Sequence, residues 1–457
     1  MSTKPNIGKL FLALALCLLL VGIVFGLLAS IVYVKPDFLK NSIGFTALRP
    51  LHVSFVTLWI IIAANGSVMS ALHLLNPNKL SNKLAAAQLT LWLIAIVGIA
   101  NSYFHHDFGG REYWEFNPIW ALPIAAAWIL YLINFIKTVK SIKTWPVYVW
   151  MWLTGGLFFM FTFIENYLWV FPYFRDNFVL DMTIQWKVNG SLVGSWNQLI
   201  YGTAFFLMDK ITGNNKVGFS KIAFGMYFLG LFNLMFNWGH HVYTLPTDSY
   251  IRYIGYIVSM TEWIFFARII FQWKQSVSDM KKNYHFFPYR FIMASDIWVF
   301  ANMGLAVLMS IPVLNIYTHG THVTVAHAMG TTIGINSMIL LAACFMFLGN
   351  NCTNYNKANK WLNMLFYTTQ ISLLVFWLAL NIAGIKKGIW QNSVIQSNYH
   401  DMMQDLTPYF ATFIIAGFVL VVALLIIAAT LLYNYAACYL KKSNSTVNLS
   451  HTKSNIL

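Results

Sequence analysis

Twelve long apolar stretches run along this chain, and they restrict its fold more than any other feature. A helix needs roughly twenty consecutive apolar residues to cross a hydrocarbon core about 30 Å thick. Only 9% of the 457 residues are charged, whereas soluble domains carry about 25%. We therefore predict an all-α, polytopic membrane protein with twelve transmembrane helices, at residues 10–34, 51–75, 84–104, 119–139, 145–170, 187–208, 217–243, 250–273, 290–316, 321–348, 362–385 and 408–434.

The positive charge of the chain, formally +15, is unevenly distributed between the predicted connections. With twelve spans, both termini and the even-numbered connections share one side of the membrane, and most lysines and arginines fall on that side. The positive-inside rule then places both termini in the cytoplasm. The basic excess indicates topology, so we expect membrane lipid and no nucleic acid as a partner. Residues 1–440 form one predicted helical domain, and the polar residues 441–457 are expected to be a disordered cytoplasmic tail.

Histidines in three separate spans are predicted to lie at a similar depth in the membrane. His52 lies near the outer end of the second span, and His240 and His241 lie near the outer end of the seventh. His327 lies roughly 9 Å below the start of the tenth span at 1.5 Å per residue. Because an imidazole inside a bilayer commonly binds a metal or a haem, this convergence predicts a cofactor site. The alternative is that these histidines serve packing or lie at the lipid interface.

The spacing within these segments indicates different roles. His240 and His241 are about 100° apart on a helix, so both side chains can reach one non-haem metal. His327 and Met329 are about 200° apart, so one helix can offer an axial ligand to each of two haems on its opposite sides. His52 would then supply the second axial ligand of the haem that Met329 faces. Met329 in the apolar core is the alternative reading.

Other polar groups are predicted to surround this site. Glu262 lies about twelve residues into the eighth span, where a proton-handling or site-lining role is expected. The outer loop at residues 109–115 carries Arg111, which would hold haem propionates, and Glu112, which would bind a hard cation. A solvated loop is the alternative. The four cysteines form no CxxCH motif, so no covalently attached c-type haem is expected.

Five motifs, in this order, resemble those of the catalytic subunit of the haem–copper oxidase superfamily, and nitric oxide reductase more than the cbb3-type cytochrome c oxidase subunit I. They are the low-spin haem segment Leu48-Arg49-Pro50-Leu51-His52, the calcium-binding loop Gly110-Arg111-Glu112-Tyr113, the metal pair in Trp238-Gly239-His240-His241, the glutamate segment Ser259-Met260-Thr261-Glu262, and the high-spin haem segment from Thr318-His319-Gly320-Thr321 to Ala326-His327. The resemblance extends over all twelve spans.

The resemblance implies a subunit of the bacterial inner membrane with two b-type haems, one low-spin and one high-spin. It also implies a non-haem iron or copper beside the high-spin haem, a calcium ion at Glu112, and a membrane-anchored c-type cytochrome as electron donor. Nitric oxide reductases of this superfamily join two NO molecules with two electrons and two protons to form N2O and water.

Several residues depart from the motifs of the superfamily. Asn189 stands where the third metal histidine is expected, and Val193 and Asn197 replace glutamates near the metal. Met329 stands where the second axial histidine of the low-spin haem is expected. The crosslinked tyrosine of the oxygen reductases would fall at Val193 or at Leu234, neither of which is a phenol. An asparagine carbonyl is a weaker and harder ligand than imidazole, which makes copper less suitable than iron.

Three functions remain compatible with the sequence. The preferred one is a nitric oxide reductase-like enzyme that uses an iron held by His240, His241 and Asn189. The second is another gas chemistry, either O2 reduction as in a cbb3-like cytochrome c oxidase or NO dismutation. The third is a haem-bearing electron-transfer or sensor subunit whose non-haem site is empty.

Overall fold

The computed structural model describes residues 5–243, 245–259, 263–349 and 359–454. Most of these residues are helical, because a chain surrounded by hydrocarbon must satisfy its backbone N–H and C=O groups within itself. The elements are α1 (Gly8–Ile31), α2 (Gly44–Leu75), α3 (Asn82–Phe104), β1 (Phe108–Arg111), β2 (Trp114–Phe116), η1 (Pro118–Trp120), α4 (Ala121–Val139), α5 (Val147–Glu165), η2 (Leu168–Val170), α6 (Pro172–Arg175), α7 (Phe178–Thr212), α8 (Lys221–Phe236), η3 (Asn237–Val242), α9 (Ser249–Ser259), α10 (Trp263–Ser276), α11 (Asp279–Tyr284), α12 (Phe286–Ser310), α13 (Pro312–Thr318), α14 (His322–Met329), η4 (Gly330–Ser337), α15 (Met338–Leu348), α16 (Lys360–Gln391) and α17 (Tyr399–Ser454).

Ten helical segments in the described part of the chain are long and apolar enough to cross a membrane. They coincide with ten of the twelve predicted spans, which confirms a multi-pass helical architecture. The predicted span 187–208 lies within α7, a helix of 35 residues. The predicted span 250–273 is divided between α9 and α10, and residues 260–262 between them lie outside the described residues. The count of twelve stays a prediction.

Several predicted span boundaries differ from those in the structure. The span predicted at 290–316 ends at Ser310, because Ile311 precedes Pro312 and is extended, with φ −71° and ψ 120°. A residue before proline is restricted away from the α region, so a new helix, α13, begins at Pro312. At the other end of the chain, the backbone of α17 continues to Ser454, into the segment predicted to be a tail.

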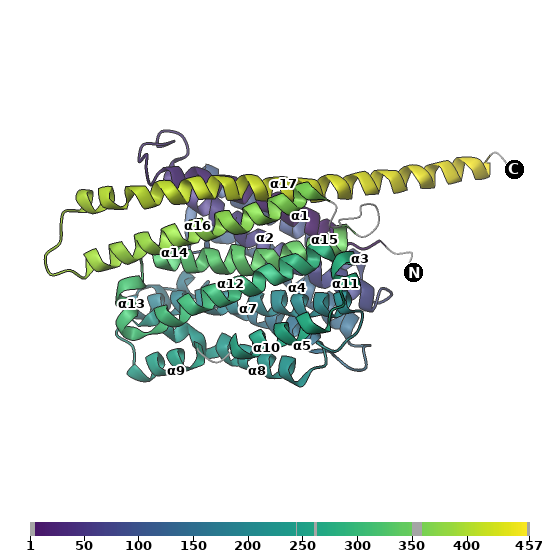
Figure 1. Ribbon diagram of the computed structural model, residues 1–457, viewed down its shortest axis with the longest axis horizontal. Coiled ribbons are helices and arrows are strands. Elements are labelled where there is room, and N and C mark those ends of the chain that lie inside the picture. Colours follow the sequence, from purple (N-terminus) through teal and green to yellow (C-terminus); the bar gives the residue numbers. More distant parts are fainter. Residues whose placement is uncertain (1–4, 244, 260–262, 350–358, 455–457) are drawn as a thin grey trace.

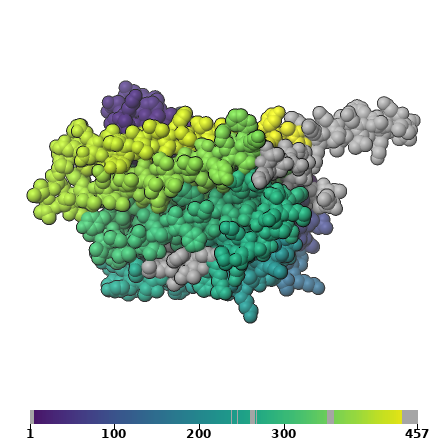
Figure 2. Space-filling view, in the orientation of Figure 1, coloured from purple at the N-terminus to yellow at the C-terminus, as the bar shows by residue number. Residues whose placement is uncertain are grey.

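The helices lie side by side in a bundle, with α16 and α17 along one edge and α8, α9 and α10 along the opposite edge (Figure 1). Within the bundle, α1 packs on α2, α5 on α7, and α16 on α17. The side chains of the green-to-yellow segments, from α12 to α17, pack closely over the face shown in Figure 2. The N-terminal end of α1 and the C-terminal end of α17 lie toward the same end of the bundle (Figure 1).

The pair α1–α2 packs with its two backbones in close approach. A Cβ atom on Gly66 of α2 would lie 2.9 Å from the carbonyl oxygen of Gly8 and 2.9 Å from the amide nitrogen of Leu12, both in α1. Small residues at helix contacts allow this approach in membrane proteins, where the hydrophobic effect does not drive helices together. Residues of both helices also line a cavity inside the bundle.

We expect Gly66→Ala to lower the thermal unfolding temperature of the detergent-solubilised protein. The added methyl group meets backbone atoms, which move less readily than side-chain ends, and overpacking of this kind costs about 1–3 kcal/mol. The matched control is Gly304→Ala in α12, where an added Cβ would meet nothing within 4 Å. That control gains helix propensity, so its unfolding temperature should equal or exceed the wild-type value. Equal unfolding temperatures for Gly66→Ala and wild type would contradict the close approach.

Candidate functional site

A cavity of about 730 Å³ lies between the helices, within the range typical of ligand pockets. Its walls come from α1, α2, α7, α8, η3, α10, α12, α14, η4, α16 and α17, and from the turn between β1 and β2. Seven predicted site residues line it, namely His52, Glu112, Asn189, His240, His241, His327 and Met329. Arg111 is not among the described residues that line the cavity. Glu262 lies outside the described residues.

His52 is oriented by a backbone carbonyl of the neighbouring helix. Its Nδ1 lies 2.8 Å from the carbonyl oxygen of Gly22 in α1. Because a carbonyl oxygen only accepts hydrogen bonds, Nδ1 must carry the proton, and Nε2 keeps its lone pair. A histidine that binds a metal is usually held in this way through its other ring nitrogen. The side chain lines the cavity, so His52 fits the role of an axial haem ligand.

His327 lies where an α-helix changes into a π-helix. The last turn of α14 holds His327, and the π-helix η4 begins at Gly330. Such π segments in longer helices often occur at functional sites. No described residue offers a hydrogen-bond partner to the buried His327 Nδ1. A polar atom of this kind is costly unless water or a ligand satisfies it, so His327 fits a site that binds a further group.

Asn302 of α12 holds the backbone where α14 passes into η4. No sequence pattern indicates this role. Its Nδ2 donates to the carbonyl oxygen of His327 at 3.1 Å and to Oγ1 of Thr331 at 2.8 Å. Trp377 Nε1 donates to Asn302 Oδ1 at 3.4 Å. The side chain is fully buried. Asn302 therefore orients the segment from which His327 and Met329 project, and only the packing of α12 on η4 brings it there.

Met329 and His327 meet different parts of the bundle. Met329 packs against the smaller apolar cluster, whose buried members come mainly from α16 and α17. His327 lies within electrostatic reach of His241. The two side chains therefore line the same cavity from one helix while facing different neighbours.

The histidine pair lies on a short 3-10 helix, not on the α-helix expected from the sequence. The helix α8 ends at Phe236, and η3 carries His240 and His241 with their ring centroids 4.2 Å apart and their planes inclined by 32°. On the other side, a Cβ atom on Gly190 of α7 would lie 3.2 Å from His241 Nε2. Within the described ranges, no group of three or more His, Cys, Asp or Glu side chains is arranged to hold a metal ion.

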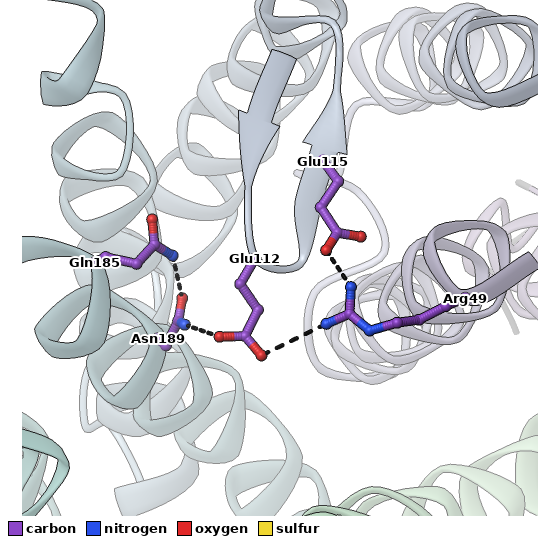
Figure 3. Close-up of polar contacts among 5 residues, drawn as sticks. All are labelled: Arg49, Glu112, Glu115, Gln185 and Asn189. Carbon is purple, nitrogen blue, oxygen red and sulfur yellow. Dashed lines mark hydrogen bonds and ion pairs between the residues drawn. The ribbon is translucent and has the colours of Figure 1, made fainter. Parts of the chain in front are cut away.

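A polar network crosses one side of the cavity and joins α2, the β1–β2 turn and α7 (Figure 3). Arg49 of α2 forms an ion pair with Glu115, and its Nη2 lies 3.8 Å from Glu112 Oε1. Asn189 Nδ2 donates to Glu112 Oε2 at 3.1 Å, and Gln185 Nε2 donates to Asn189 Oδ1 at 3.2 Å. Burial raises the pKa of the Glu112 carboxyl group, and the positive charge of Arg49 opposes this increase.

The two guanidinium groups of this region lie in different surroundings. Arg111 donates to Asp181 at 2.9 Å and lies 4.5 Å from the ring centroid of Trp169. Arg49 lines the cavity instead. It lies three residues before His52, on the same face of α2, so this spacing could have identified it. Arg49 is therefore better placed than Arg111 to hold an anionic group of a cofactor.

Aliphatic side chains occupy the positions where oxygen reductases of the superfamily are expected to carry their tyrosine. Val193 of α7 and Leu234 of α8 both line the cavity. Tyr201 also lines it, but twelve residues beyond Asn189 on α7, which is about 18 Å along a helix axis. The cavity wall next to the histidine pair thus includes two aliphatic groups at these positions.

Comparisons with known proteins agree with the architecture. The family model described as cytochrome c and quinol oxidase polypeptide I matches residues 6–439. The chain is 24% identical to a nitric oxide reductase subunit of Stutzerimonas stutzeri, over 84% of each chain. It is 22% identical to the cytochrome c oxidase subunit 1 of Rhodobacter capsulatus, over 78% of this chain and 70% of that protein. The fold is similar to that in a cryo-EM structure of a heme-copper terminal oxidase dimer, with a TM-score of 0.73 and 14% identity, over 95% of this chain and 84% of that one.

We expect Asn302→Leu to destabilise the protein and to change its visible absorption spectrum. The substitution keeps the branched shape of the side chain but removes the donor to the His327 carbonyl, and each buried polar group left without a partner costs about 1–3 kcal/mol. The matched control is Asn381→Leu in α16, because among the described residues Asn381 donates only to Trp377 O, four residues earlier in its own helix. The control should lose less stability and keep the wild-type spectrum. Identical spectra for Asn302→Leu and wild type would refute the orienting role.

Proposed function

Because the chain belongs to the cytochrome c and quinol oxidase polypeptide I family, we propose that it is a haem-bearing oxidoreductase subunit that reduces NO to N2O. The observation that carries this proposal is the wall of the cavity beside the histidine pair. Val193 and Leu234 are aliphatic there, and a phenol is the group that four-electron O2 reduction requires in this superfamily. The likeness to a nitric oxide reductase subunit supports the same choice.

Five of the residues that line the cavity would hold two haems and one metal. His52, with Nε2 available, and Met329 would hold the low-spin haem b, and His327 would hold the high-spin haem. His240 and His241 would hold the non-haem iron. When bound, these groups supply electron transfer and a site for a small gas. The protein's own part is to orient the imidazoles, to neutralise propionates through Arg49, and to keep the site apolar.

The membrane arrangement follows from the same proposal. Twelve helices would cross a bacterial inner membrane, and both termini would lie in the cytoplasm, which agrees with the N-terminal end of α1 and the C-terminal end of α17 lying toward one end of the bundle (Figure 1). A membrane-anchored c-type cytochrome would deliver electrons from the outer side. The Glu112 segment lies on the predicted outer side, so protons would reach the cavity there.

Anaerobic turnover of the purified protein with NO tests the reaction. We expect one N2O for every two NO consumed, measured by gas chromatography with a reduced electron donor. Release of O2 from NO would indicate dismutation. Consumption of O2 without any N2O formation from NO would indicate a terminal oxidase. Two b-type haems with no additional iron or copper, and no turnover of either gas, would indicate an electron-transfer or sensor subunit.

We expect His327→Ala to remove the high-spin haem signal while the low-spin signal remains, because only one of the two haems loses its ligand. Optical and EPR spectra of the purified variant provide the measurement. His322→Ala is the matched control, since His322 lies on the same helix and also lines the cavity, but packs against Tyr33 and Phe410. Its variant should retain both signals. Retention of both signals in His327→Ala would refute the assignment.

We expect Met329→His to lower the reduction potential of the low-spin haem. A thioether ligand favours the ferrous state relative to imidazole, and axial ligands set haem potentials over a range of roughly 0.8 V. A redox titration followed at the low-spin absorption band measures the shift. Met329→Leu, which offers no ligand, should convert the low-spin signal to a high-spin one. If neither substitution changes the titration or the spectrum, Met329 is a packing residue.

A further inference from the structure

Asn189 stands at the position predicted for the third metal donor, yet both ends of its amide are engaged elsewhere. Nδ2 donates to Glu112 Oε2 at 3.1 Å, and Oδ1 accepts from Gln185 Nε2 at 3.2 Å. Asn189 and Gln185 are both buried and lie four residues apart on one face of α7. Figure 3 shows the amide of Asn189 between the Gln185 and Glu112 side chains. The carbonyl oxygen, the only amide atom suited to a metal, is therefore already a hydrogen-bond acceptor.

The neighbours of Asn189 determine which way its amide faces. An ionised carboxylate only accepts hydrogen bonds, so the atom that faces Glu112 must be the NH2 group. That orientation turns the carbonyl oxygen toward Gln185, whose NH2 group requires an acceptor. Rotation of the carbonyl toward the histidine pair would leave the Gln185 donor and the Glu112 oxygen without these partners. Such losses are costly in a buried environment.

Glu112, which accepts the hydrogen bond from Asn189 Nδ2, lies between the two groups of proposed ligands. Glu112 lines the cavity and lies 3.8 Å from Arg49 Nη2, and Arg49 in turn is three residues before the proposed haem ligand His52. Asn189 is on the opposite helix, one residue before Gly190, where His241 approaches α7. The amide of Asn189 thus connects the helix beside the histidine pair with the charged group beside the other haem ligand.

We infer that Asn189 is a positioning residue that holds the Glu112 carboxylate against Arg49, and that it is not the third ligand of the non-haem metal. Among the described residues, the two imidazoles of His240 and His241 would then hold that metal. The remaining coordination positions are left for substrate or water. This inference rests on the proposed cofactor site but not on which gas is reduced.

Infrared difference spectroscopy of the full-length purified protein tests the positioning role. The C=O stretching band of protonated Glu112 is assigned by its loss in Glu112→Gln, and its amplitude is followed against pH. A hydrogen bond donated to an ionised carboxylate lowers the pKa, and two to three such bonds lower it by about two pH units. In Asn189→Leu we therefore expect the midpoint of the Glu112 band to rise by about one pH unit. Gln185→Leu keeps the Asn189–Glu112 bond and should leave the midpoint unchanged.

Iron affinity, measured by competition with a chelator, tests the second half of the inference. We expect Asn189→Leu and wild type to bind non-haem iron equally. The loss of a partner outside the ligand sphere already costs about 10–100-fold in metal affinity, and the loss of a ligand should cost at least as much. With both haems retained, a loss of more than about 100-fold in Asn189→Leu would show that Asn189 is a ligand, whereas a smaller loss would place it outside the ligand sphere. Wild-type protein without non-haem iron would exclude Asn189 as a ligand, and the band titration would then decide its role.

Asn189→Ala provides a second variant if Asn189→Leu does not fold, because the side chain faces the cavity and its truncation only enlarges that space. An unchanged Glu112 midpoint in both variants would overturn the positioning role. Failure of NO turnover with a shifted Glu112 midpoint would reject NO reduction and leave this inference standing. N2O formation with an unchanged Glu112 midpoint would support NO reduction and reject the positioning role of Asn189.

Discussion

The turn at which α14 passes into η4 orients both of the proposed ligands that share one helix. His327 and Met329 lie two residues apart at this turn, and the carbonyl oxygen of His327 is held by Asn302 from a neighbouring helix. A rotation of this segment would move both side chains together, so the buried amide of Asn302 orients both proposed ligands. The segment packs against α16 and α12, and its residues line the same cavity as residues of α7, α8, η3 and α17.

Charged groups inside an apolar bundle are tolerated only when each has a partner. Arg49 contacts Glu112 and Glu115, and the Asn189 amide satisfies a further oxygen of Glu112. The network occurs next to His52 because α2 carries both Arg49 and this histidine. The same residues that stabilise these charges in the bundle also connect α2 with α7 across the cavity.

Several parts of this arrangement could be predicted from the sequence, because they depend on local pattern. The long apolar stretches predicted ten spans that the structure contains. The depth of His52, His240 and His327 along their spans predicted that they converge, and all three line one cavity. Helical spacing and depth require only the rise and periodicity of a helix, so they are accessible without tertiary information. The roles of these residues toward cofactors remain proposals.

Other features were decided only by the tertiary structure. Arg111 was the predicted partner of a cofactor anion, but Asp181 and Trp169 from elsewhere in the fold engage it, and Arg49 lines the cavity. Asn302 gave no local signal, since its partner His327 is 25 residues away. By itself, the sequence determined ten helices long and apolar enough to cross a membrane, because these follow from hydropathy and helix geometry. Which polar side chains meet was decided by helix packing, because a hydrogen bond depends on the rotation and separation of two helices that no single segment encodes.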